Sequence, residues 1–263
     1  MTSQVHPTAI VDKGAVLGKN VKIGAYAQIG SHVVLEDGVE IFPHAIVTGH
    51  TRVGENTKIF SFACLGYMPQ VTGFQEVDTK IEIGTNNLIR EYVTVHPGTP
   101  KGGGITRIGN NCMVMVACHI GHDCQVGNNV TMANNATLGG HVIVGDFAII
   151  GGLSGIHQYV ELGHGCIIGG LSGVEGHVVP YGSVMGNRAR LSGLNLVGLK
   201  RRDLSRTTIH ALRTAYRLLF ANEGTLLERM DDVQEMFSEE AEVMEIIAFL
   251  RKNNGGIRPL CLP

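Results

Sequence analysis

The chain of 263 residues contains 36 glycines, no tryptophan and only 5% aromatic residues, a composition that points to a repetitive core. Its formal net charge of −2 provides no overall basic field, so nucleic acid and anionic membrane surfaces have no electrostatic support as partners. The sequence shows no charged n-region, apolar h-region or membrane-length apolar run. We therefore expect a cytoplasmic protein without an integral membrane segment.

A six-residue period organises most of residues 1–190. An aliphatic residue begins each unit, glycine often follows it, and a small or β-branched residue often lies four positions later. Such a unit suits a short strand plus a turn with the aliphatic side chain inside, which predicts a parallel solenoid. The period breaks near residues 67–82 and 100–107, where we predict insertions. Its aliphatic positions include Val11, Leu17, Ile23, Ile29, Leu35, Ile41, Val47, Val53, Ile59 and Leu65, and later Ile108, Val114, Ile120, Val126, Met132, Leu138, Val144 and Ile150.

Four of the six cysteines occupy the small inward position of the repeat. A free thiol at such a position acts as a small hydrophobic group, so we expect core packing instead of catalysis, metal binding or disulfides. These residues are Cys112, Cys118, Cys124 and Cys166.

The repeat ends near Pro180, and residues 191–263 are predicted to form a small helical domain that caps the solenoid. Ser205, with Thr208 three positions later, marks the start of a helix that stops at Asn222-Glu223-Gly224. A second helical stretch is predicted from about Leu226 to Lys252. The repeat resembles that of the hexapeptide-repeat transferases, which implies three units per triangular coil and a left-handed winding, although crossovers are otherwise right-handed. The expected fold is thus mainly β, a left-handed parallel β-helix with a C-terminal α-helical domain.

Polar residues gather within a few units of the solenoid, at His119-Ile120-Gly121-His122-Asp123, Gly139-Gly140-His141 and His157-Gln158. With a coil of eighteen residues, Gly140 lies above His122 and His141 above Asp123, one strand spacing of about 4.8 Å away. His122 is then placed to act as a base, Asp123 or a neighbouring group to fix its tautomer, and the Gly140 N–H to face a developing oxyanion. Acyl transfer to a sugar hydroxyl requires these parts. Because no exposed Ser or Cys is placed as a nucleophile, direct attack is the simpler mechanism.

The other histidines are scattered on turns or helix, and a solvated surface position is expected for each. They are His6, His32, His44, His50, His96, His164, His177 and His210.

Two other classes of function compete with acyl transfer. The γ-class carbonic anhydrases also resemble this solenoid and hold zinc with three histidines, which His119, His122 and His141 could superficially supply. The helical tail and the two insertions favour a larger substrate, so we expect neither a metal nor a cofactor. A purely structural solenoid leaves the polar cluster without a purpose.

The segment from Arg188 to Arg217 contains eight basic residues against one acid, Asp203. A solvated helix face explains such a run, but in an otherwise acidic protein it also suits acyl carrier protein, whose recognition helix is acidic, or a nucleotide pyrophosphate. The basic residues are Arg188, Arg190, Lys200, Arg201, Arg202, Arg206, Arg213 and Arg217.

From His6-Pro7-Thr8-Ala9-Ile10 into the helical tail, the chain resembles the UDP-N-acetylglucosamine 3-O-acyltransferases of lipid A synthesis. The motifs that carry this resemblance are His119 to Cys124, Ala133 to Leu138, Gly140-His141-Val142, Phe147 to Gly152, His157-Gln158 and Gly198-Leu199-Lys200-Arg201-Arg202.

This resemblance implies a transfer of a 3-hydroxyacyl chain from acyl carrier protein to a UDP-aminosugar, with His122 as general base and Gly140 as oxyanion donor. It also implies a homotrimer with sites between subunits, in which insertions around Gln70 and Lys101 reach toward a neighbour. Gly170 lies where the resembling enzymes set acyl length, so we expect about fourteen carbons, because a missing side chain leaves the groove open. The other residues that the resemblance places around the substrates are His119, His141, Gln158, Asn195, Arg201 and Arg202, with Arg188 standing where relatives often have His.

The first insertion departs from that family. Many relatives show Gln-Asp-x-Lys-Tyr where this chain has Gln70-Val71-Thr72-Gly73-Phe74, and Val197 stands where a Glu is common, so three charged positions are neutral. Lys80 or Lys101 is a candidate for compensation. A 3-amino analogue of the UDP-sugar is the alternative acceptor, because an amine is the stronger nucleophile and depends less on a clamped sugar. The hydroxyl acceptor remains favoured because deprotonating an alcohol is what requires a base such as His122.

Overall fold

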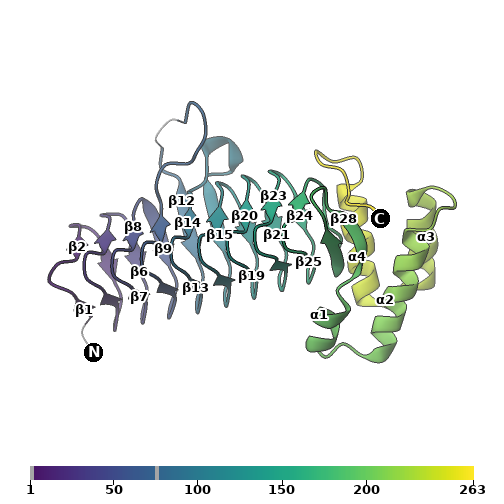
Figure 1. Ribbon diagram of the computed structural model, residues 1–263, viewed down its shortest axis with the longest axis horizontal. Helices are drawn as coiled ribbons and strands as arrows, with labels where there is room; N and C mark the ends of the chain where they lie inside the picture. The colour runs from purple at the N-terminus through teal and green to yellow at the C-terminus, as the bar shows by residue number, and fades with distance from the viewer. Residues whose placement is uncertain (1–2, 75–76) are drawn as a thin grey trace.

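The computed structural model describes residues 3–74 and 77–263; Gln75 and Glu76 of the first insertion lie outside the described residues. Its body is a parallel β-helix, with the N-terminus at one end and four helices gathered at the other (Figure 1). Strands stack directly above one another, as in the pairing of Gln125 with Ile143 and of Ile143 with Glu161. The predicted coil of eighteen residues is therefore confirmed.

The first sheet ends with an antiparallel pair, and its strands otherwise run parallel. Over the described residues it has 11 strands: β1 (Gln4–Val5), β4 (Lys22–Ile23), β7 (Glu40–Ile41), β10 (Lys58–Ile59), β13 (Leu88–Ile89), β16 (Met113–Val114), β19 (Thr131–Met132), β22 (Ile149–Ile150), β25 (Ile167–Ile168), β27 (Gly182–Met185) and β28 (Arg190–Leu194).

The second sheet carries the polar cluster. Its nine strands in the part of the chain that the structure describes are β2 (Ile10–Val11), β5 (Gln28–Ile29), β8 (Ile46–Val47), β11 (Cys64–Leu65), β14 (Thr94–Val95), β17 (His119–Ile120), β20 (Thr137–Leu138), β23 (Gly155–Ile156) and β26 (Gly173–Val174).

The third sheet forms the remaining face of the triangular β-helix. Counted over 3–74 and 77–263, its eight strands are β3 (Val16–Leu17), β6 (Val34–Leu35), β9 (His50–Val53), β12 (Lys80–Ile83), β15 (Ile105–Ile108), β18 (Gln125–Val126), β21 (Ile143–Val144) and β24 (Glu161–Leu162).

The interior of the β-helix is a continuous aliphatic core. The aliphatic residue of each predicted unit is the last residue of a short strand and points inward; Ile59, Ile120 and Leu138 are fully buried. The small inward positions include the four predicted core cysteines, each at most 2% exposed. Burial raises the pKa of Cys118 to about 11 and that of Cys166 to about 12, so both thiols stay protonated at neutral pH.

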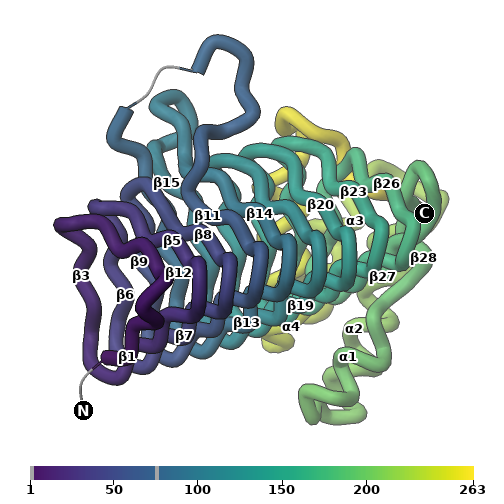
Figure 2. The backbone as a smooth tube through the Cα atoms, turned by 60° about the vertical axis from the view of Figure 1, so that its left-hand side comes forward, coloured from purple at the N-terminus to yellow at the C-terminus, as the bar shows by residue number. Residues whose placement is uncertain are grey.

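Both insertions leave the β-helix at the corner between the second and third sheets (Figure 2). The first spans residues 66–79, between β11 and β12. The second spans residues 96–104, between β14 and β15, and contains the 3-10 helix η1 (Pro100–Gly102). His122 lies at the same corner, in the turn between β17 and β18. The two departures from the six-residue period thus lie along the edge that carries the polar cluster.

The helical domain consists of α1 (Leu196–Arg201), α2 (Arg206–Leu219), α3 (Leu226–Met236) and α4 (Ala241–Asn253). Ser205 caps α2 as predicted, because its Oγ accepts the Thr208 N–H at 3.0 Å. The prediction of one helical stretch from Leu226 to Lys252 is wrong. Apolar spacing continues across the break, but α3 ends at Met236 and a new N-cap, Glu240, starts α4, so that both helices pack on α2.

The C-terminal end of the chain returns to the β-helix after α4. The His177 N–H donates to the Pro259 carbonyl at 2.7 Å, and the Cys261 N–H donates to the His177 carbonyl at 2.8 Å. Among the described residues, none of the helices is both long and apolar enough to cross a bilayer.

Candidate active site

A groove of about 560 Å³ runs along the second sheet, at the corner that carries the insertions. Gly155 and Gly173 leave the outward positions of β23 and β26 without side chains, and a Cβ added to Gly155 would meet nothing within 4 Å. The residues that line it are Gln70, His96, His119, Gly121, His122, Thr137, Gly139, Gly140, Gly155, Ile156, His157, Gln158, Gly173, Val174 and Glu175.

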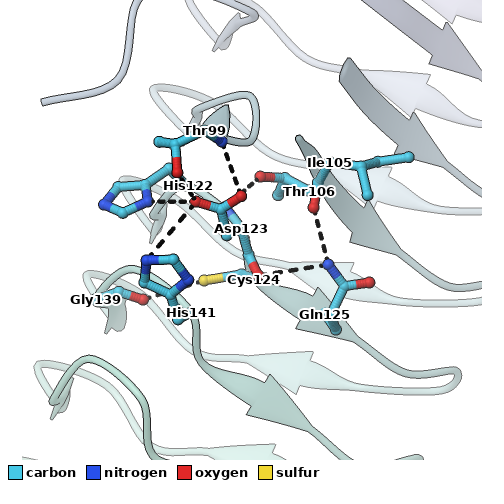
Figure 3. Close-up of polar contacts among 9 residues, drawn as sticks. All are labelled: Thr99, Ile105, Thr106, His122, Asp123, Cys124, Gln125, Gly139 and His141. Atoms are coloured by element: carbon cyan, nitrogen blue, oxygen red, sulfur yellow. Dashed lines mark hydrogen bonds and ion pairs between the residues drawn. The ribbon is translucent and has the colours of Figure 1, made fainter. Parts of the chain in front are cut away.

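His122 and Asp123 form a hydrogen-bonded pair at the edge of this groove (Figure 3). His122 Nδ1 lies 2.7 Å from Asp123 Oδ2, and the side chains are 17% and 0% exposed. Since an ionised carboxylate only accepts hydrogen bonds, Nδ1 carries the proton and Nε2 has a free lone pair. The two residues are adjacent in one turn, where Asp123 adopts the left-handed conformation at φ 60°. In this turn the two side chains meet. This is the arrangement of a neutral imidazole that can accept a proton.

The second insertion encloses the Asp123 carboxylate. Thr99 donates twice, from its N–H to Oδ1 at 2.8 Å and from its hydroxyl to Oδ2 at 2.6 Å. The Asp123 N–H donates to Thr106 Oγ1 at 2.8 Å (Figure 3). The segment around Lys101, which we expected to extend toward a neighbouring subunit, folds over Asp123 of its own chain, although the Lys101 side chain itself is exposed. Sequence reasoning missed Thr99 because the insertion has no period from which to derive its path.

His141 lies one coil beyond His122 and beside it. Its Nε2 is 3.8 Å from Asp123 Oδ2, its ring meets that of His122 edge-on at 4.9 Å, and it stacks on Tyr159 at 4.4 Å. Burial lowers the pKa of His141, and the adjacent His122 lowers it further against the opposing effect of Asp123. At neutral pH a neutral imidazole is therefore the dominant form of His141.

Gly140 stands directly over the His122 ring. A Cβ added there would lie 2.5 Å from His122 Cε1 and Nε2, so any side chain at this position would displace the His122 ring. The two flanking N–H groups are used, that of Gly139 by Ile156 O and that of His141 by His122 O, both at 2.9 Å. Among the described residues, no acceptor takes the Gly140 N–H. This donor is left for a ligand beside the His122 base.

His119 and His96 line the same groove. His119 Nδ1 is 2.8 Å from Thr94 Oγ1, and the two rings meet edge-on at 4.9 Å. Burial, and then the nearby His119, lower the pKa of His96 to about 4. The expectation that His96 and His177 are solvated was wrong: they are 7% and 5% exposed. The groove encloses His96, whereas His177 is covered by the returning C-terminal segment and accepts the Glu161 N–H at 2.9 Å.

Gln70 and Gln158 also line the groove, from the first insertion and from the turn after β23 respectively. The adjacent His157 contacts the Arg258 guanidinium, which also donates from Nε to the Gln158 carbonyl at 3.0 Å. Arg258 carried no motif or period in the sequence, and only the return of the C-terminal segment brings it to this rim.

Other residues that the resemblance implicated lie outside the groove lining of their own chain. Gly170 is at the opposite corner of the second sheet, between β25 and β26, where an added Cβ would be 3.3 Å from Gly152 O. Arg188 pairs with Glu175, a groove-lining residue, at 3.5 Å. Arg201 is exposed at the end of α1.

Asn195 and Arg202 have structural partners. The Asn195 side chain is 6% exposed, accepts the Gly198 N–H at 2.9 Å as the cap of α1, and donates to Gly165 O at 3.0 Å. The Arg202 guanidinium lies over the Phe147 ring at 4.7 Å and near the Tyr181 ring at 5.8 Å. In one chain, both side chains therefore join the helical domain to the β-helix.

Within the part of the chain that the structure describes, the three residues with ligand atoms close enough to hold a metal are His122, Asp123 and His141, within 4.8 Å of one another. This differs from the set of His119, His122 and His141 that a zinc enzyme would have used. Both Asp123 oxygens already accept hydrogen bonds, from Thr99 and from His122, so the carboxylate is arranged to orient an imidazole.

Comparisons with known proteins agree with this geometry. Residues 178–258 match the family model described as UDP N-acetylglucosamine O-acyltransferase, domain 2, and residues 105–140 match that of bacterial transferase hexapeptide repeats, which indicate a left-handed β-helix. The curated acyl-[acyl-carrier-protein]–UDP-N-acetylglucosamine O-acyltransferase of Caulobacter vibrioides is 50% identical over 98% of both chains. That of Rickettsia canadensis is 49% identical over 96% of both.

Solved structures show the same similarity. The UDP-N-acetylglucosamine acyltransferase of Campylobacter jejuni superposes with a TM-score of 0.93 at 38% identity, over 99% of this chain and 100% of that one. That of Francisella novicida gives 0.94 at 30% identity, over 99% and 94%. The chain therefore belongs to the acyl-[acyl-carrier-protein]–UDP-N-acetylglucosamine O-acyltransferase family, and its fold is the left-handed parallel β-helix with a C-terminal helical domain.

Proposed function

We propose that this enzyme transfers an (R)-3-hydroxyacyl chain from acyl carrier protein to the 3-hydroxyl of UDP-N-acetylglucosamine, the first step of lipid A synthesis, in the cytoplasm. The observation that carries the proposal is the His122–Asp123 pair beside the free Gly140 N–H, at the edge of an elongated groove. The relatives' names supply the donor and acceptor.

The proposed reaction is a direct attack. His122 Nε2 takes the proton of the sugar hydroxyl as its oxygen bonds to the thioester carbonyl carbon. The carbonyl oxygen becomes an oxyanion, which the Gly140 N–H stabilises. When the C–S bond breaks, the thiolate of the carrier leaves and takes the proton from the His122 imidazolium. Asp123 stabilises that imidazolium, and His119, His141 and Gln158 surround the sugar nucleotide.

The basic residues of the helical domain support docking of the acidic carrier protein. Arg213 and Arg217 of α2 border a hollow of about 360 Å³ with His210 and Tyr216. Arg201 is exposed nearby in sequence, at the end of α1. Opposite charge of this kind accelerates encounter with a carrier whose recognition helix is acidic.

A homotrimer with sites between subunits is also part of the proposal. Gly170 and Arg201 lie outside the groove of their own chain, so a role in binding substrate requires a neighbouring subunit. Exposed apolar side chains follow the corner between the first and second sheets and support burial against such a neighbour. They are Tyr26, Phe62, Tyr92, Leu153 and Leu171, between 48% and 72% exposed.

The acceptor is tested by competition. The purified enzyme is given 3-hydroxyacyl carrier protein and equal concentrations of UDP-N-acetylglucosamine and its 3-amino analogue, and products are separated by mass spectrometry. We expect the ester to dominate and His122→Ala to lose about 10²–10⁴-fold in turnover. The alternative amine acceptor is motivated by Val71, Gly73 and Val197, which provide no charge for the sugar nucleotide. An amide formed far faster than the ester would overturn the hydroxyl acceptor.

A further inference from the structure

We propose that Thr99, carried by the second insertion, is a positioning residue that fixes the Asp123 carboxylate and thereby sets both the orientation and the proton affinity of the His122 base. This inference deepens the proposed acyl transfer and rests on it for its kinetic part. Nothing in the repeat pattern marks Thr99, and it does not line the groove; its side chain reaches the base through Asp123.

Thr99 holds together the turn of the second insertion, which covers Asp123. Its carbonyl accepts the N–H groups of Gly102 at 3.0 Å and Gly104 at 2.8 Å, which close the turn around η1. The Lys80 N–H of β12 donates to the Gly104 carbonyl at 2.8 Å and ties the turn to the third sheet. Thr99 itself is 7% exposed. The Thr99 backbone, which provides one donor and carries the other, is therefore held in place by backbone hydrogen bonds.

The insertion also seals the carboxylate from water. A Cβ added to Gly102 would lie between 2.1 and 2.4 Å from the Asp123 carboxyl atoms, so the backbone passes directly over them. The Asp123 side chain is 0% exposed. In such an enclosed site each hydrogen bond to the charge is stronger than in water, and losing one leaves the charge poorly solvated.

The Thr99 hydroxyl and the His122 Nδ1–H share one acceptor atom, Asp123 Oδ2, at 2.6 and 2.7 Å. Removing the hydroxyl leaves more of the negative charge available to His122, which favours the imidazolium form. It also removes one of the two Thr99 contacts that fix the carboxylate relative to His141, whose Nε2 is 3.8 Å away. Among the described residues, His119 of β17 and His96 after β14 also face the pair.

The test compares Thr99→Val, which removes only the hydroxyl, with Thr99→Ser, which retains it. The matched control is Thr57→Val: Thr57 is also buried, and its hydroxyl also donates to an oxygen, Gly84 O at 2.9 Å, but it lies outside the groove. We expect Thr99→Val to lose about 10–100-fold in kcat with little change in the acceptor KM. The acid limb of its kcat/KM profile should move to higher pH, and Thr99→Ser should restore both.

Wild-type kcat and an unmoved acid limb in Thr99→Val would overturn the proposal, as would equal effects in Thr57→Val. Thr99→Ala carries the same expectation if the valine variant does not fold. A readout independent of activity is the His122 Nδ1–H resonance in NMR spectra. We expect a downfield, slowly exchanging proton that Thr99→Val shifts and Thr57→Val does not, and an unchanged resonance would contradict the role of Thr99. A wild-type protein inactive on every acyl donor would refute the proposed function while this resonance still tests Thr99.

Discussion

Alanine at position 140 would place a methyl carbon inside the contact shell of the His122 ring. The added Cβ would lie 2.5 Å from Cε1 and Nε2 and 3.1 Å from Cδ2. Carbon atoms pack at about 3.5–4.0 Å, so the ring must move by roughly 1 Å or more. His122 is partly exposed at the rim, so its ring has room to rotate outward. This movement breaks the 2.7 Å hydrogen bond to Asp123 and moves the His122 Nε2 atom away from the sugar hydroxyl that it deprotonates.

A displacement of about 1 Å in a reacting group costs about 10²-fold, and complete loss of the base costs up to about 10⁴-fold. We therefore expect Gly140→Ala to lower kcat within this range. The fold should lose no more than about 1 kcal/mol, because the ring moves toward solvent and Asp123 keeps both Thr99 donors.

The assay measures initial rates with 3-hydroxyacyl carrier protein and UDP-N-acetylglucosamine, together with thermal unfolding. Gly155→Ala is the matched control: it adds the same methyl group to the same groove, but the Cβ meets nothing within 4 Å. It should retain kcat even if substrate binding weakens. A Gly140→Ala enzyme with wild-type kcat would refute both the placement of His122 and its role as the base.

Three further expectations follow from the described residues. Cys118→Ala should leave kcat unchanged, because burial raises the pKa of this thiol to about 11; a loss comparable to that of His122→Ala would restore a thiol or metal mechanism. Between pH 6.5 and 4 the unfolded chain binds a proton at His96 that the folded protein does not, so the free energy of unfolding should fall by about 2 kcal/mol as the pH decreases. In urea titrations the free energy of unfolding of His96→Gln should fall less over the same range. Gly170→Met should shift donor preference to shorter acyl chains in competition assays, and preference of the wild type for ten carbons would count against about fourteen.

The regular part of the fold could be predicted from the sequence because each six-residue unit of the sequence forms one strand and one turn of the β-helix. From Ile23 onward the aliphatic residue of each six-residue unit is a buried strand residue, and an eighteen-residue coil converts sequence distance into contact, as for His122 and Gly140. The same regularity predicts a core position for Cys118, which is 1% exposed. In the helical domain, apolar spacing alone did not reveal the break between α3 and α4, because both helices continue the same spacing while they turn to pack on α2.

The candidate site was predictable only where it lies on the repeat. His119, His122, Asp123, Gly140 and His141 are repeat positions, and their neighbours follow from the coil. The contacts of Thr99 and Arg258 could not be derived in this way, since an insertion or a returning tail has no register, and the burial of His96 depends on the insertion that follows it. Their burial and their hydrogen bonds are consequences of long-range backbone paths.

This division between repeat and insertion also explains how a regular scaffold can orient a catalytic base. The coil fixes the spacing of His122, His141 and Tyr159 at successive turns and brings their rings side by side. A repeat corner left open to solvent would leave the Asp123 carboxylate hydrated and its interaction with His122 weak. The second insertion replaces that water with Thr99 and the backbone at Gly102, and so gives this corner of the solenoid an enclosed carboxylate that orients the imidazole base.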